Sequence, residues 1–114
     1  MKKKSRLTRQ RDFQAVLGGR RAYGGRCLVA FGRTLDEGGV RVGVATSRRI
    51  KGAVRRNRVR RRLRAATRLW LAGHPFPEAG ADVVLIGREE SCEAPFEELA
   101  AQVGLALAKV LGRT

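Results

Sequence analysis

The stretch GAVRRNRVRRRLR, residues 52–64, contains seven arginines in thirteen positions and no acidic residue. At 100° per residue, Val59, Leu63 and Ala66 fall on one face of a helix, and Trp70 extends the same face by one turn. A helix with such a stripe packs its apolar edge on a sheet and leaves its other faces to solvent. The stretch therefore predicts one amphipathic, strongly basic helix.

The face opposite the apolar stripe is a ridge of guanidinium groups around a single amide. Like charges at helical spacing repel each other, so the ridge makes sense only if a partner neutralises it. The planar donor fork of arginine fits phosphate, and the amide of Asn57 suits a sugar hydroxyl, a base edge or a metal-bound water. On the helical wheel Asn57, Arg58, Arg61, Arg64 and Arg68 form the ridge, Arg60 and Arg62 flank the stripe, and Arg56 falls near the apolar edge.

The charge of the chain is concentrated in its first part. The net charge is +15 over 114 residues. Residues 1–68 hold 22 basic and three acidic residues, whereas residues 69–114 hold three basic and seven acidic ones. A merely solvated helix face usually mixes both signs, but residues 48–68 carry eleven basic residues and no acidic one. This asymmetry indicates a polyanionic partner, with nucleic acid ahead of an anionic membrane.

Length and composition favour a single soluble domain. A chain of 114 residues with 43% hydrophobic residues can bury one modest core. No apolar segment follows the basic start MKKKSRLTRQ, and the longest aliphatic run, residues 83–86, is too short to cross a bilayer. Cys27 and Cys92 stand alone, so we expect two reduced thiols rather than a disulfide or a metal site. We expect a cytoplasmic protein without a membrane partner.

The first half of the chain predicts a helix and two strands. We expect a flexible basic tail over residues 1–7 and a single RNA-binding α/β domain over residues 8–114. Thr8 is expected to cap a first helix that ends at Gly18-Gly19 and carries Phe13, Val16 and Leu17 on one side. Two alternating runs, RCLVAFGRTL at 26–35 and VRVGVATS at 40–47, are expected to pair as a hairpin across the turn DEGG.

The second half predicts a strand and a helix after the arginine helix. DVVLIG at 82–87 is apolar on both faces, so we expect it at the centre of the sheet. The helix that begins near Pro95 carries a core stripe. The predicted order is α-β-β-α-β-α, a two-layer α/β (α+β) sandwich. The stripe of the last helix consists of Phe96, Leu99, Val103, Leu107 and Val110.

The sequence offers few groups for catalysis. The single histidine, His74, lies in a proline-rich loop, and no carboxylate pair or nucleophile motif is present. A stand-alone nuclease would need metal-binding carboxylates on the basic face, and Asp12 is the only acid near it in the sequence. Two other classes stay open: a structural RNA-binding protein of ribosomal type, and a DNA-binding module, although nothing resembles a helix-turn-helix or a zinc finger.

Residues 41–64, RVGVATSRRIKGAVRRNRVRRRLR, resemble the signature of the bacterial ribonuclease P protein component. In that signature R-V-G is followed by a serine, two basic residues, a G/A-V step and the R-N-R motif. Arg6-Leu7 and Asp12-Phe13 resemble the family's N-terminal pairs, and DVVLIGR resembles its last strand. The resemblance covers residues 6–88, and the final helix agrees in position only.

The resemblance implies a fold, an activity and partners. Such a protein is the small subunit of a ribonucleoprotein that removes the 5′ leader of precursor tRNA, and the large RNA subunit is the catalyst. Mg²⁺ would be held by the RNA and the substrate, with no catalytic or metal-binding residue in the protein. The implied fold is ribosomal protein S5 domain 2-like, with a βαβ crossover of the rare left hand. We expect the catalytic RNA and precursor tRNA as partners, and no obligate protein partner.

The resemblance also implies two binding surfaces. Leu17 stands where the family often has an aromatic side chain, which would weaken stacking at that position. From spacing alone, however, Phe13 and Phe31 are predicted to be core residues. The surface for the catalytic RNA would comprise Arg56, Asn57, Arg58, Arg60, Arg61, Arg64 and Arg68. The cleft for the single-stranded leader, between the first helix and the sheet, would involve Phe13, Phe31, Ser47, Arg48 and Arg49.

Overall fold

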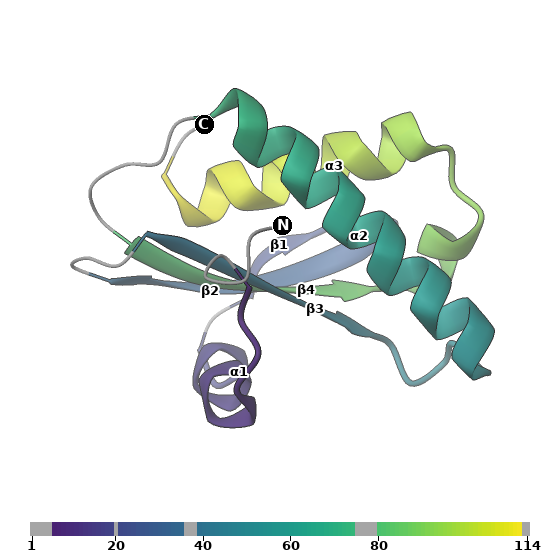
Figure 1. Cartoon of the computed structure of the whole chain (residues 1–114), viewed down its shortest axis with the longest axis horizontal. Helices are drawn as coiled ribbons and strands as arrows, with labels where there is room; N and C mark the ends of the chain where they lie inside the picture. Colours follow the sequence, from purple (N-terminus) through teal and green to yellow (C-terminus); the bar gives the residue numbers. More distant parts are fainter. Residues whose placement is uncertain (1–5, 20, 36–38, 75–79, 113–114) are drawn as a thin grey trace.

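A computed structural model describes residues 6–19, 21–35, 39–74 and 80–112 of the chain. Four strands form one sheet, α2 and α3 cover one of its faces, and the short α1 lies on the other (Figure 1). The α/β sandwich and the order of its main elements are confirmed, with β1 and η2 in addition. The elements are α1 (Gln10–Leu17), β1 (Arg21–Gly24), β2 (Leu28–Leu35), β3 (Val40–Thr46), α2 (Ala53–Gly73), β4 (Gly80–Gly87), the 3₁₀ helix η2 (Glu89–Cys92) and α3 (Phe96–Val110).

The strand order in the sheet is β1-β2-β4-β3. β4 pairs antiparallel with β2 and parallel with β3, so the predicted hairpin between β2 and β3 is wrong. The physical reason is the apolar run of β4, which gains most from burial on both faces, and the central position provides it. That position was predicted correctly. β3, α2 and β4 form the parallel crossover that the family resemblance implies.

β1 was missed because its four residues, RAYG, are too short to show alternation. They pair antiparallel with β2, with a register irregularity between Arg21 and Tyr23. The strand forms the outer edge of the sheet and brings Tyr23 against the main core.

The main core lies between the sheet and the two long helices. Val59, Leu63 and Ala66 of α2 are buried, as the helical wheel predicts, and Trp70 is half-buried beside them. Gly87 of β4 has no room for a Cβ because the Val59 side chain occupies the space. α2 therefore lies directly on the central strand, and its outer face points away from the sheet.

A smaller core fixes α1 on the opposite face. Val16 and Leu7 are buried there with Val84, and Phe13 and Phe31 pack around them half-buried. Leu7 also donates its backbone N–H to the Val42 carbonyl at 3.0 Å. Leu7 therefore packs as part of the domain, whereas the sequence predicts it in the basic tail. Residues 1–5 of the predicted tail lie outside the described residues.

The start of α1 differs from the prediction. The residue before its first turn is Arg9, which makes no side-chain cap, so Thr8 does not cap this helix. Burial of Leu7 fixes the chain one residue earlier and leaves Thr8 exposed. α1 ends at Leu17, before Gly18, as expected.

A buried carboxylate ties α1 to the strands. Asp82 of β4 has no exposed surface and accepts hydrogen bonds of 2.8–3.1 Å from Arg33 of β2 and Arg41 of β3. Asp12 of α1 lies 3.6 Å from Arg41 and 3.9 Å from Arg33. Burial alone would raise the pKa of Asp82, but the hydrogen bonds and charges of Arg41 and Arg33 outweigh it and hold that pKa below its usual value.

Candidate nucleic-acid interface

The outer face of α2 presents the predicted ridge. The helix begins after Gly52, whose φ of 87° favours glycine, and runs for 21 residues. Asn57, Arg61 and Arg68 are exposed, and Arg60 donates to the Asn57 side-chain oxygen at 3.2 Å. The amide of Asn57 therefore holds one guanidinium in place and keeps its own donors for a ligand.

Two arginines of α2 turn toward η2. Arg58 donates from Nε to the Cys92 carbonyl at 3.0 Å, and Arg62 donates to the carbonyls of Ser91 and Ala94. Arg58 was expected on the ridge; the structure leaves it exposed but uses one of its donors inside the protein. The helical wheel gave no sign of these bonds because their acceptors lie in an unpredicted 3₁₀ helix and in the two residues after it.

Arg64 lies at the opposite side of α2, over the edge strand β3. Burial lowers the pKa of Arg64, and the charges of Arg6 and Arg60 lower it further. Arg6, which sequence reasoning did not assign to a site, pairs with Val42 in an isolated bridge. A cavity of about 220 Å³ lies here, lined by Arg6, Leu7, Thr8, Phe13, Val42, Gly43, Val44 and Arg64. The ridge thus continues around β3 toward the side of the sheet that carries α1.

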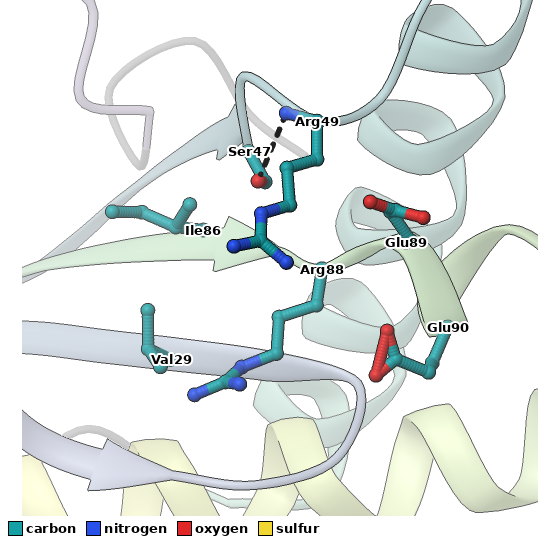
Figure 2. Close-up of a pocket in the computed structure, with 7 residues that line it drawn as sticks. All are labelled: Val29, Ser47, Arg49, Ile86, Arg88, Glu89 and Glu90. Carbon is teal, nitrogen blue, oxygen red and sulfur yellow. Dashed lines mark hydrogen bonds between the residues drawn. The ribbon is translucent and has the colours of Figure 1, made fainter.

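A second cavity, of about 420 Å³, lies where β3 and β4 end. Val29 and Ile86 are paired neighbours in the sheet and form an apolar floor, while Arg49 and Arg88 extend their guanidinium groups beside it (Figure 2). The Ser47 hydroxyl accepts the Arg49 backbone N–H at 3.2 Å. Its lining residues are Val29, Ser47, Arg49, Ile86, Arg88, Glu89 and Glu90. We call this the strand-end cavity.

Two of the five predicted leader residues line this cavity. Ser47 and Arg49 line it, and Phe31 lies two residues from Val29 on the same face of β2. Phe13 packs from α1 against Gly43. Arg48 is exposed but lines none of the cavities described above.

The two phenylalanines are partly buried, and their contact with a leader stays a prediction. Each packs against the small core around Val84 and each keeps part of its surface exposed. Leu17 is 37% exposed at the end of α1. Sequence reasoning missed Val29, Ile86 and Arg88. Alternation along β2 and the end of the β4 run were the signals that could have found them.

Two glutamates line the strand-end cavity together with Arg49 and Arg88. Glu89 and Glu90 are exposed on η2 and line the same cavity. In the described parts of the chain, neither forms an ion pair with Arg49 or Arg88. The cavity therefore offers carboxylate acceptors as well as guanidinium donors, a mixture that suits a nucleotide better than a bare phosphate.

The single histidine has a structural partner. His74 stacks on Trp70 with ring centroids 4.0 Å apart, and its Nδ1 lies 2.8 Å from the Trp70 carbonyl. Cys27 and Cys92 are buried free thiols, as expected. Over residues 6–19, 21–35, 39–74 and 80–112, no group of three His, Cys, Asp or Glu side chains could hold a metal ion. Within those ranges no helix has the length and apolar character to cross a membrane.

Comparison with known proteins decides the family. The family model described as Ribonuclease P matches residues 1–111 of the chain. The chain belongs to the ribonuclease P protein family.

Relatives of this family are similar over most of their length. The ribonuclease P protein component of Paramagnetospirillum magneticum is 36% identical over 110 residues, which cover 92% of this chain and 81% of the relative. The component of Acidothermus cellulolyticus is 38% identical and covers 95% of this chain and 86% of its own.

Solved structures of ribonuclease P proteins have the same fold. The protein from Thermotoga maritima superposes with a TM-score of 0.72 at 24% identity, covering 96% of each chain. The protein from Staphylococcus aureus gives a TM-score of 0.72 at 22% identity, covering 100% of this chain and 97% of its own. The ribonuclease P fold is thus retained although about three quarters of the residues differ.

Proposed function

We propose that this chain is the protein subunit of a ribonuclease P holoenzyme and assists removal of the 5′ leader from precursor tRNA in the cytoplasm. The ridge of α2 binds the catalytic RNA subunit, and the strand-end cavity with the adjoining face of the sheet binds the single-stranded leader. The RNA carries the active site, and Mg²⁺ held by RNA and substrate supplies the activated water. The protein binds the catalytic RNA and the leader and orients the leader for cleavage.

The strand-end cavity is the observation that carries this proposal. Its apolar floor of Val29 and Ile86 continues into half-exposed Phe31, and Arg49 and Arg88 flank it. Single-stranded RNA is held by this combination, because unstacked bases need an apolar or aromatic face and the backbone needs cations. A surface made only for a duplex would need no such floor.

Each group has a part that its chemistry fits. Guanidinium groups of Arg49 and Arg88 neutralise leader phosphates, which reduces the repulsion between the leader and the negatively charged catalytic RNA. The Ser47 hydroxyl orients the start of the turn that carries Arg49. On α2, Arg61, Arg68 and the Asn57–Arg60 pair bind backbone phosphates and sugar hydroxyls of the catalytic RNA.

A cleavage assay at low Mg²⁺ tests the proposal. The protein, ribonuclease P RNA and labelled precursor tRNA are mixed at a Mg²⁺ concentration too low for the RNA alone. The complete mixture should release the leader, because the protein's cations replace part of the ionic screening that the two RNAs need. Rigorously RNA-free protein should release none. Cleavage by the protein alone, or failure of the protein to lower the Mg²⁺ requirement, would contradict the proposal.

A further inference from the structure

Arg62 leaves the surface of α2 and points at the short helix η2. Its two terminal nitrogens donate to the carbonyls of Ser91 and Ala94, and its side chain is half-buried. Arg58, one turn earlier, adds its bond to the Cys92 carbonyl. Two guanidinium groups of α2 thus bind two carbonyls in the last turn of η2 and a third, that of Ala94, two residues after its end.

These carbonyls need donors from outside the helix. η2 spans four residues, and the last carbonyls of any helix lack partners within it. Ser91, Cys92 and Ala94 are buried, so water cannot readily take the place of a donor. A guanidinium suits this end because the carbonyl end of a helix carries partial negative charge.

The other side of η2 belongs to the strand-end cavity. Glu89 and Glu90 form one wall of it, and Arg88 precedes them (Figure 2). Ser91 donates both its hydroxyl, at 2.6 Å, and its backbone N–H, at 2.9 Å, to the Arg88 carbonyl. A continuous set of hydrogen bonds therefore runs from Arg62 through Ser91 to Arg88.

We propose that Arg62 is a positioning residue for the strand-end cavity. Through η2 it sets where Arg88, Glu89 and Glu90 stand around a leader nucleotide, and it makes no contact with RNA itself. The inference rests on the proposed function, because the leader is the ligand of the cavity. It also divides the arginines of α2: those on the ridge serve the catalytic RNA, whereas Arg62 serves the precursor.

Binding by the assembled holoenzyme tests the role of Arg62. Arg62→Met keeps an unbranched stem and removes all donors. The preference for precursor over mature tRNA should fall by about threefold or more, the range expected for a residue that acts through its neighbours. Affinity for the catalytic RNA should stay within about twofold of wild type, because the ridge is intact. Arg62→Lys, which keeps a charge and a donor, should recover part of the preference.

Arg55→Met is the matched control. Arg55 is exposed on the first turn of α2 and lines a neighbouring hollow with Glu89 and Glu90. This variant removes the same charge from the same helix without breaking a bond to η2, so the preference should not change. An equal loss in both variants would assign the effect to charge and overturn the inference.

Hydrogen exchange of the isolated protein separates the two proposals. In Arg62→Met the amides of Ser91, Glu93 and Ala94 should exchange about tenfold faster, and that of Val84 in β4 should not change. Melting curves set a temperature at which each variant is folded, and Arg62→Lys replaces Arg62→Met should the latter not fold. Unchanged exchange in η2, or faster exchange with an unchanged preference, would overturn the positioning role. A wild-type holoenzyme without any preference for precursor would instead refute the proposed leader cavity itself.

Discussion

Phe31 is the residue at which core and binding surface meet. It packs beside Val84 with part of its ring exposed, in the same row of β2 as Val29. Phe31→Ala should weaken precursor binding by about 1–3 kcal/mol if a leader base stacks on the ring, and leave mature tRNA binding unchanged. The holoenzyme's affinity for both tRNAs, measured with folded variant, checks this. A parallel fall in both affinities would mean that Phe31 serves only the core.

Asp82 is the residue on which the attachment of α1 depends. Its folded pKa is depressed, so its contribution to stability is present above its unfolded pKa of about 3.9 and is lost as the pH falls through the lower folded value. Asp82→Asn should cost about 1.5–3 kcal/mol, because Arg33 and Arg41 lose a charged hydrogen-bond acceptor but stay partly exposed to water. Urea unfolding from pH 7 downward checks this. The variant's stability should vary less than that of wild type on the acid side; curves that remain parallel there would exclude the assigned role.

At the scale of elements, one edge of α2 packs in the core and the other is exposed for RNA binding. Arg61 is exposed and Leu63 is buried, two positions apart. Arg61→Ala should weaken binding to the catalytic RNA and flatten its salt dependence, with the melting temperature nearly unchanged. Leu63→Ala should cost about 2–5 kcal/mol of stability by emptying a core position. Melting curves and salt titrations of both variants check the assignment, and a reversed pattern would show that the faces were exchanged.

Helical periodicity predicts α2 well because the spacing of its apolar residues alone decides which face is buried. The stripe at Val59, Leu63 and Ala66 follows from 3.6 residues per turn, and no distant contact is needed to recognise it. The hydrogen bonds of the Arg58 and Arg62 side chains cannot be predicted from this spacing. Their acceptors lie about thirty residues away in η2, whose four residues carry no periodic signal of their own.

For the whole molecule, pairing between distant strands limits what the sequence reveals. β2 and β3 are neighbours in the chain, and the sequence DEGG between them is a local signal for a hairpin. The decisive contribution comes from β4, which lies between them and buries Val83 and Leu85 on one face and Val84 on the other. The family resemblance alone places Ser47 and Arg49 in the leader cleft. Arg88 lies beside them because β4 pairs with β3, and this pairing could not be read from the sequence.

The place of β4 in the sheet also orders events during synthesis. β2 and β3 do not pair with each other, and each takes β4 as its neighbour in the sheet, so this pairing must wait until Gly87 has left the ribosome. Until then the arginine helix is already made, while β2 has only β1 as a partner and β3 has no neighbouring strand in the sheet. Closing the sheet requires contacts between segments far apart in the chain, which slows folding relative to local hairpins. A nascent chain that stops at Gly73 would hold the whole basic ridge but lack β4, the strand on which α2 lies.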